Sequence, residues 1–235
     1  MSLPGFNRVP RLTVPENDRD PAEAYLKERG LDPDRWFVCV YWREPGYSNR
    51  SPHSLRDILD PTAYMAVIEH VVENLGGQVV RLGHPTPTTL KAHPDIIDLA
   101  QVEDSLMTQI TAISRARFFI SSPSGPVTFG PGLGTPTAVT DNICVGGVWN
   151  DHDILYTQTI ISPGGESFRQ RSAFDAGLLA AQKQSNYEAM FEKGYRYVKN
   201  SSDDLIHVTE MLPRRTTDCL KWREPAPVPR ATLST

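Results

Sequence analysis

The chain has 235 residues, of which 39% are hydrophobic and 22% are charged, and its formal net charge at pH 7 is −4. This composition is that of an ordinary soluble globular protein and excludes the disordered and fibrous classes. The acidic balance argues against nucleic acid as a partner, because phosphate backbones are bound through basic side chains. No apolar run reaches the roughly 18 residues of a membrane span. The first twenty residues lack the apolar core of a secretory signal, so we expect a cytoplasmic protein.

The two ends of the chain are predicted to be extended. Residues 1–20 are polar and rich in proline, which predicts an N-terminal arm. Residues 214–235 contain the Pro-rich stretch REPAPVPRATLST, which predicts a C-terminal tail. Between them, residues 21–213 are expected to form one α/β domain. Its first element is a short helix at residues 21–29, with Asp20 as the N-cap and a proline at the first helical position.

The middle of the chain alternates short apolar strands with helices. The continuous apolar run from Trp36 to Trp42 is typical of a strand buried on both faces, as in a parallel sheet. Apolar side chains at helical spacing predict a helix at 61–75, and QVVRL predicts a second strand at 78–82. Strands are also predicted at 96–99, 118–120 and 137–140, and helices at 106–115 and 127–133. This alternation predicts a doubly wound, mostly parallel, Rossmann-like α/β sheet with right-handed crossovers.

The pattern weakens after residue 142. Residues 145–168 look like a loop with one apolar strand candidate. Helices are predicted at 173–182 and 202–211, and the second begins with a Ser-Ser-Asp sequence that is typical of a helix cap. We find no internal repeat.

Candidate ligand-binding residues follow the predicted strands. In open parallel sheets, ligands bind beyond the carboxyl ends of the strands, at the point where the strand order reverses. The residues at these ends are Arg43, Glu44, Gly46 and Tyr47 after the first strand, Gly83 and His84 after the second, Gln101 after the third, Ser121, Ser122, Ser124 and Gly125 after the fourth, and Asp141 and Asn142 after the fifth.

The stretch FFISSPSGPVTFGPGLGTPTAVTDN, residues 118–142, places a small polar corner after an apolar strand. Ser124 and Gly125 would lie at a helix N-terminus, where free backbone N–H groups favour an anion. Arg43 would face the same crevice and could hold a phosphoryl oxygen through two N–H groups. A phosphate or diphosphate fits this arrangement. The alternative is a Gly/Pro-rich turn without a ligand, with Arg43 in a surface ion pair with Glu44 or Asp57.

Other chemistries lack their sequence signatures. Neither GxGxxG after the first strand nor GxxxxGK[ST] is present, which argues against a Rossmann dehydrogenase and a P-loop NTPase. No G-x-S-x-G elbow surrounds the serines of the corner. The triplet Asp151-His152-Asp153 could hold a divalent ion, although a loop of solvated acids is favoured. The cysteines, Cys39, Cys144 and Cys219, show no metal-binding spacing, and Cys39 is expected to be a buried, inert thiol. We therefore expect no metal, no cofactor and no disulfide.

Taken in order, several pieces of the chain resemble one protein family. They are FVCVYWREPGY, YMAVIEHVVENLGGQVVRLG, DIIDLA, AISRARFFISSPSGP, GTPTAVTDN and VKNSSDDLIHVTEML. From Leu31 to about Leu212, the chain is similar to bacterial glycosyltransferases that are distantly related to fucosyltransferases. It resembles the nucleotide-sugar-binding C-terminal half of such a GT-B-like enzyme.

The resemblance implies a glycosyltransferase that works without a metal and binds a nucleotide sugar, with a GDP-sugar as the favoured donor. It implies that Arg43 contacts the donor diphosphate and that Asp98 contacts the base. It also implies that Ser122, Ser124 and Gly125 contact phosphate. Other positions match the family pattern without an assigned role, namely Tyr47, Arg81, Gly83 and Asn142.

The sequence also departs from the family. GT-B enzymes use two Rossmann-like halves, and the length suffices for the donor half only. Tyr41 stands where related fucosyltransferases carry a histidine. The acceptor side would come from a second copy of the chain, a partner subunit or the N-terminal arm. Glu44, Asp57 and His84 are candidates, by position alone, for the general base. The alternatives are a non-catalytic nucleotide-sugar-binding module, and a hydrolase or other transferase that uses the same phosphate corner.

Overall fold

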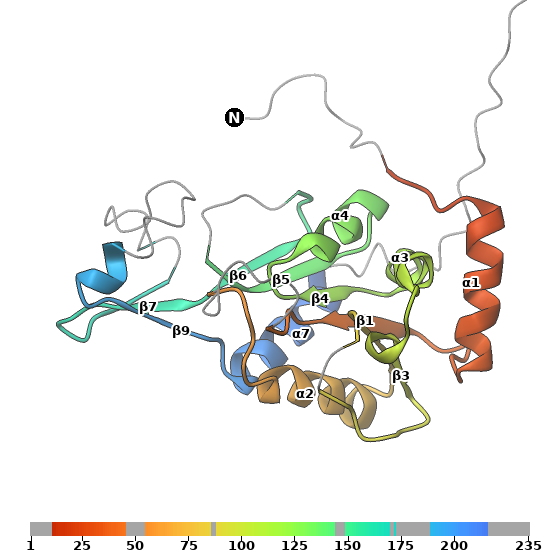
Figure 1. Cartoon of the computed structure of the whole chain (residues 1–235), viewed down its shortest axis with the longest axis horizontal. Helices are drawn as coiled ribbons and strands as arrows, with labels where there is room; N and C mark the ends of the chain where they lie inside the picture. Colours follow the sequence, from red (N-terminus) through yellow and green to blue (C-terminus); the bar gives the residue numbers. More distant parts are fainter. Residues whose placement is uncertain are drawn as a thin grey trace, which may run out of the picture.

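The computed structural model of the chain describes residues 11–45, 55–85, 88–143, 149–169, 172 and 189–215. A six-stranded, all-parallel sheet forms its centre (Figure 1). The strands are β1 (Phe37–Tyr41), β2 (Gln78–Leu82), β3 (Ile96–Asp98), β4 (Phe119–Ser121), β5 (Thr137–Asn142) and β6 (Ile154–Thr157). This sheet confirms the predicted α/β class.

The strand order is β3-β2-β1-β4-β5-β6. The sheet grows outward from β1 to β3, and the chain then crosses back to place β4 on the other side of β1. In the register, Cys39 of β1 lies opposite both Val80 of β2 and Phe119 of β4. The strand order therefore reverses between β1 and β4, as in a doubly wound fold.

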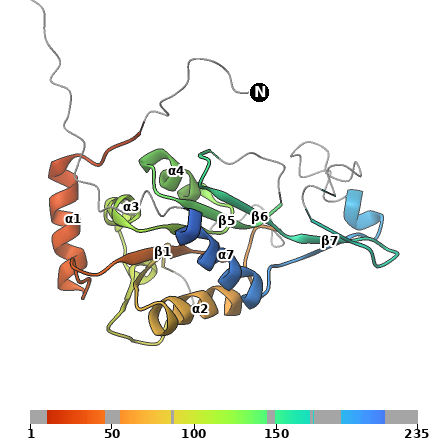
Figure 2. The ribbon, with the colours of Figure 1, turned by 180° about the vertical axis from the view of Figure 1, so that it is seen from behind.

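Helices cover both faces of the sheet. They are α1 (Glu16–Glu28), α2 (Thr62–Glu69) with its π-helical continuation η1 (His70–Asn74), the 3-10 turn η2 (Leu99–Gln101), α3 (Leu106–Arg115), the 3-10 turn η3 (Gly125–Thr128), α4 (Phe129–Leu133) and α7 (Ser202–Arg215). Helices α2 and α7 pack together on one face, and α3 and α4 lie on the other (Figures 1 and 2). None of the helices in the described ranges is long and apolar enough to cross a membrane.

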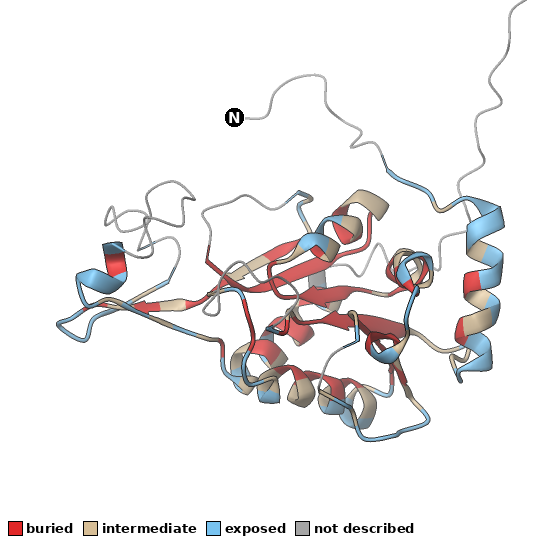
Figure 3. Ribbon diagram, in the orientation of Figure 1, coloured by how far each residue is buried: buried red, intermediate tan, exposed pale blue. Residues whose placement is uncertain are grey.

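The core consists of two apolar layers, one on each face of the sheet. Val38 and Val40 of β1 join the apolar cluster under α2 and α7, whereas Phe37 and Cys39 join the cluster under α1 and α3. Successive strand side chains point to opposite faces, so a strand covered on both sides needs an unbroken apolar run. Figure 3 shows the central strands as the most buried part of the molecule. Cys39 is fully buried, as predicted, and burial raises the pKa of its thiol.

A small antiparallel sheet extends from one end of the main sheet (Figure 1). It contains β7 (Thr159–Ile161), β8 (Ser167–Phe168) and β9 (Arg196–Val198), in the order β8-β7-β9. The sequence indicated one strand in residues 145–168, whereas the structure has β6, β7 and β8 there. These strands are very short, and β7 pairs with a strand about 35 residues away, so the local pattern is weak.

The N-terminal boundary differs from the prediction. Helix α1 begins at Glu16 with Pro15 as its N-cap, and Pro21 lies inside the helix, so the assignment of Asp20 as the N-cap is wrong and residues 16–20 are not part of an extended arm. Residues 1–10 of the predicted arm lie outside the described residues. Acidic side chains in the first turn favour this earlier start. Leu12 also donates a backbone hydrogen bond to the carbonyl of Gly132, at 2.8 Å, which fixes this segment against α4.

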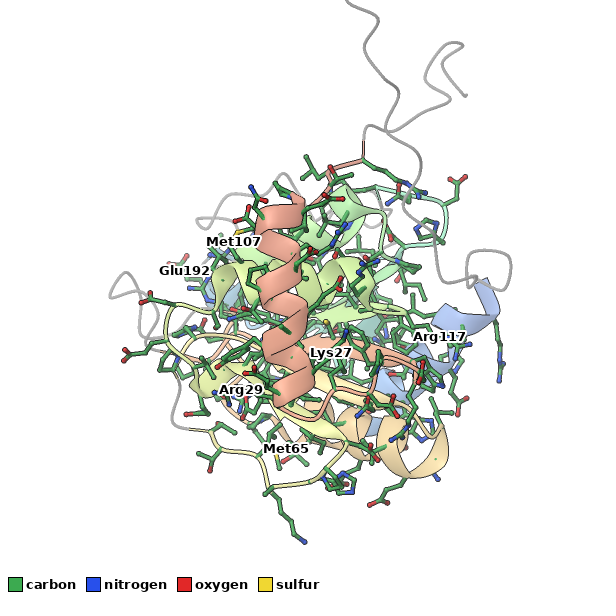
Figure 4. All side chains as sticks on the ribbon, turned by 90° about the vertical axis from the view of Figure 1, so that its right-hand side faces the viewer. Lys27, Arg29, Met65, Met107, Arg117 and Glu192 are labelled. Carbon is green, nitrogen blue, oxygen red and sulfur yellow. The ribbon has the colours of Figure 1, made fainter. Side chains whose placement is uncertain are left out.

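Helix α1 lies along the flank of the domain, as the view from that side shows, with Lys27 and Arg29 near its C-terminal end (Figure 4). An ion pair between Arg115 Nη2 of α3 and Glu23 Oε1 of α1, at 2.6 Å, joins the two helices. At the other end of the chain, α7 continues past the expected boundary at residue 213. The helix predicted at 173–182 lies outside the described residues.

We predict that Ile120→Ala lowers the free energy of unfolding by about 2–5 kcal/mol, because it leaves a cavity in the core. Ile120 is fully buried in β4. Leu59→Ala is the control, since Leu59 is 76% exposed and its loss should change stability by less than about 0.5 kcal/mol. Chemical denaturation measures both, and equal effects would contradict the burial of β4.

Candidate functional site

The carboxyl ends of β1 and β4 are joined where the strand order reverses. Arg43 follows β1 closely, and Ser122 follows β4. The backbone N–H of Arg43 donates to Ser122 Oγ at 2.8 Å, and the N–H of Ser122 donates to the carbonyl of Tyr41 at 3.1 Å. The structure thus brings together two of the predicted site residues, and it fixes them to each other through the backbone.

The side chain of Arg43 forms an ion pair with Asp57. Arg43 Nε lies 2.7 Å from Asp57 Oδ1, and the two side chains are 14% and 7% exposed. One of the two partners considered from the sequence is therefore present, but the pair is largely buried rather than on the surface. The N–H of Ile58 donates to the carbonyl of Arg43 at 2.8 Å, which holds the segment carrying Asp57 in place.

The Ser-Gly corner does not begin a regular helix. Gly125 starts a four-residue 3-10 turn, α4 has only five residues, and Pro126 has no N–H to offer. The predicted effect of a helix dipole on an anion is therefore weak here. Two other features leave this corner open to a ligand. Among the described residues, Ser124 Oγ is buried without a hydrogen-bond partner, and a Cβ added at Gly125 would meet no atom within 4 Å.

Asp141, at the end of β5, is held in a left-handed conformation with φ 53°. Its N–H donates to Asn200 Oδ1, and its Oδ1 accepts from the N–H of Asn200, both at 2.7 Å. Tyr64 Oη donates to Asp141 Oδ2 at 2.9 Å and contacts Thr140 Oγ1 at 2.8 Å. The next residue, Asn142, is 7% exposed. These bonds satisfy an aspartate in a conformation that short polar side chains tolerate.

Lys199 is a basic residue of this edge that the sequence did not reveal. Burial lowers the pKa of its ammonium group, and the charges of Asp141 and Asp57 raise it. The ammonium group also donates to the carbonyl of Leu55. Lys199 precedes α7 and lies far along the chain from both carboxylates, so no spacing in the sequence connects them. The two hydrogen bonds between the adjacent Asn200 and Asp141 hold this segment at the edge of the sheet.

A second charged cluster joins the ends of β1, β2 and β3. Arg81 is 1% exposed, and its Nη2 and Nη1 lie 3.0 Å from Glu44 Oε1 and from Asp98 Oδ2. The guanidinium also lies 4.1 Å from the ring centre of Trp42. Burial raises the pKa of Asp98, and the charge of Arg81 lowers it. Arg81 thus links two further candidates, Glu44 and Asp98.

Three other candidates have different surroundings. Gly83 is held by the Gln109 side chain, which accepts from its N–H at 3.0 Å and donates to its carbonyl at 2.5 Å. His84 is partly exposed; burial lowers the pKa of its imidazole, Glu44 raises it and Arg43 lowers it. Tyr47 lies outside the described residues.

The D-x-D triplet lies at the amino ends of the strands, on the side of the sheet opposite the carboxyl ends. Asp153 precedes β6 and is 2% exposed; its Oδ1 accepts from the N–H of Thr137 at 3.0 Å and its Oδ2 from the N–H of Asn150 at 2.9 Å. It therefore stabilises a turn, so the interpretation of Asp153 as a solvated acid is wrong. Within the described ranges, no group of three His, Cys, Asp or Glu side chains is placed to hold a metal ion.

No family model and no curated protein matches the chain. Solved structures do match. A glycosyl transferase of family 9 from Veillonella parvula DSM 2008 is 16% identical with a TM-score of 0.52, over 86% of this chain and 53% of that one. The dodecameric, iron-containing heptosyltransferase TibC, solved in complex with ADP-D-beta-D-heptose, is 16% identical with a TM-score of 0.40, over 80% of this chain and 48% of that one.

The doubly wound domain is therefore similar in fold to about half of a family 9 glycosyltransferase. At this level of identity the likeness is one of fold. The chain spans about half the length of both matched structures.

We predict a pH-dependent difference in stability between Asp141→Asn and the wild type. Burial raises the pKa of Asp141, so the folded state binds its proton more tightly than the unfolded state. Wild-type stability should fall as the pH rises from the ordinary aspartate pKa through this raised value. Asparagine does not titrate and tolerates a positive φ. The free energy of unfolding of the variant, relative to wild type, should rise across this window and then level off. A constant difference in urea titrations would contradict the assignment.

Proposed function

We propose that this domain binds the donor nucleotide sugar of a glycosyltransferase through its diphosphate, at the carboxyl edge between β1 and β4. The observation that carries the proposal is the meeting of Arg43 and Ser122 where the strand order reverses, since open α/β sheets bind ligands at this position. The similarity in fold to a family 9 glycosyltransferase supports it.

In this proposal, Arg43 contacts the diphosphate and stabilises it as a leaving group. A phosphate would compete with Asp57 for the guanidinium, and the nearby ammonium group of Lys199 would then help to balance Asp57. Ser122, Ser124 and Gly125 line the approach to the phosphates. The remaining predicted contacts belong to the same proposal, namely Tyr47, Arg81, Gly83, Asp98 and Asn142.

The donor we favour is a GDP-sugar, on the basis of the resemblance to fucosyltransferase-related enzymes. Neither of the two matched structures is described as a fucosyltransferase, so this preference and the assignment to a C-terminal half rest on the sequence resemblance alone. Transfer to an unidentified acceptor would then need groups beyond this domain to supply the acceptor side. The direct test is a thermal-shift screen against GDP, UDP, ADP and CDP and their sugar conjugates. A ligand at 100 times its Kd stabilises the fold by about 2.7 kcal/mol.

A second candidate function is a non-catalytic nucleotide-sugar-binding module. Its basis is the likeness in fold, which covers 53% of the matched glycosyltransferase. Hydrolysis or transfer of the donor by the purified chain alone would exclude this alternative. Donor binding without turnover would support it.

We predict that Arg43→Ala weakens binding of the best nucleotide in that screen by about 1.5–3 kcal/mol, the usual range for a hydrogen bond to a charged group. Calorimetric titration measures the affinity. Arg35→Ala is the matched control, because it removes another ion-paired arginine, the partner of Asp95, at the amino end of β1. Unchanged affinity in Arg43→Ala would overturn the placement of the site.

We predict that Gly125→Ala keeps the stability of the wild type and lowers its nucleotide affinity. A Cβ at Gly125 has open space around it, so the unliganded fold should accept it. A phosphate approaching the backbone would collide with the added methyl group. Gly130→Ala should do the reverse: its Cβ would lie 2.1 Å from Thr137 Oγ1, so it should destabilise the fold. Thermal unfolding with and without nucleotide separates the two effects, and full affinity in Gly125→Ala would exclude a close phosphate.

A further inference from the structure

One carboxylate oxygen of Glu44 accepts hydrogen bonds, and the other has no hydrogen-bond partner among the described residues. The residue directly follows Arg43 and is 3% exposed. Its Oε1 accepts from Trp42 Nε1 at 2.8 Å and from Arg81 Nη2 at 3.0 Å. Its Oε2 is buried and has no hydrogen-bond partner among the residues that the structure describes. Buried polar atoms are nearly always hydrogen-bonded, so an unpaired carboxylate oxygen calls for an explanation.

The surroundings of Glu44 fix the direction of its carboxylate. Arg81, which holds Oε1, is itself held by Asp98 Oδ2 at 3.0 Å and by the carbonyl of Thr88 at 2.7 Å. Its guanidinium also stacks on the ring of Trp42. A side chain held in this way cannot turn to find another donor. With Oε1 held in this way, Oε2 has a fixed position from which it can accept a hydrogen bond.

The chemistry of this oxygen selects the type of ligand group. An ionised carboxylate accepts hydrogen bonds and donates none, so it suits a hydroxyl or an N–H and disfavours a phosphate. Reading a nucleobase through two adjacent N–H groups takes both carboxylate oxygens, and Oε1 is already in use. A single hydroxyl is the group that fits one free oxygen.

We propose that Glu44 Oε2 accepts a hydrogen bond from a sugar hydroxyl of the bound nucleotide sugar, on either its ribose or its transferred sugar. This inference rests on the proposed function. It divides the edge of the sheet into two parts, with Arg43 facing the phosphates and Glu44 facing a hydroxyl. The two residues are adjacent in the chain, as the diphosphate and its flanking sugars are in the ligand.

The test is Glu44→Gln. The amide oxygen can keep the hydrogen bonds from Trp42 and Arg81, and an NH₂ group then replaces the free acceptor with a donor. Affinities are measured by calorimetry for three probes: the best-binding ribonucleoside diphosphate of the screen, its 2′,3′-dideoxy counterpart and its glucose conjugate. Asp153→Asn is the control, because it removes another buried carboxylate charge, at the opposite edge of the sheet, where both oxygens already have donors.

A contact with the ribose predicts roughly 10- to 100-fold weaker binding of the ribonucleotide and its glucose conjugate, and unchanged binding of the dideoxy probe. A contact with the transferred sugar predicts the same loss for the glucose conjugate alone. Equal losses for all three probes would assign the effect to the base or to charge and would overturn the proposal. Wild-type affinity for all three probes would also overturn it.

The inference and the function on which it rests can fail separately. If the wild type binds no nucleotide, the proposed function fails and this inference fails with it. If the wild type binds and Glu44→Gln binds equally well, only the inference fails.

If circular dichroism shows that Glu44→Gln does not fold, the wild type is titrated with the dideoxy nucleotide and with deoxyglucose conjugates. A loss of roughly 10- to 100-fold for one of them is expected, and full affinity for all of them would overturn the contact.

Discussion

The central position of β1 is the constraint on which the rest of the structure depends. β1 is hydrogen-bonded to β2 on one side and to β4 on the other, and apolar layers cover both of its faces. Its carboxyl end is therefore fixed relative to both halves of the sheet. Arg43 and Glu44 follow this end, so their backbone position is set by the whole core. Residues that must meet a ligand with fixed geometry are best carried by such rigid elements.

The charges at this edge are arranged in two groups around that strand end. Arg43, Asp57 and Lys199 form one group on the side of β4 and β5, and Arg81 with its two carboxylates forms the other on the side of β2 and β3. Buried ion pairs contribute little net stability, because removing charges from water is costly. Their effect here is to fix orientation. In the first group Arg43 is paired with Asp57, whereas in the second group Glu44 Oε2 has no hydrogen-bond partner among the described residues.

The likeness in fold to the matched family 9 glycosyltransferase covers 86% of this chain and 53% of that one. The small sheet of β7, β8 and β9 extends from the end of the main sheet that carries β6 (Figure 1). The main sheet itself follows the doubly wound plan, and this small sheet is an addition to it.

The sequence by itself determined five of the six strands of the main sheet, β1 to β5, and the carboxyl ends of these strands as the place for a site. The unbroken apolar run at 36–42 requires a strand covered on both faces, and the alternation of strands and helices requires a parallel sheet. These are local periodicities, which depend on neighbouring residues only. The prediction that Arg43 and Ser122 lie at the same edge followed from them, because parallel strands place all their carboxyl ends at one edge.

The tertiary structure alone decided which charges pair and which polar atoms remain unpaired. Asp57 rather than Glu44 pairs with Arg43, Glu44 pairs with Arg81, and Lys199 approaches from the segment before α7. The sequence likewise indicated one strand where the structure has β6, β7 and β8, and it did not indicate β9. The physical reason is the same in each case. Ion pairs, unsatisfied oxygens and short strand pairings depend on distances between residues far apart in the chain, and only the packing of helices and strands sets those distances.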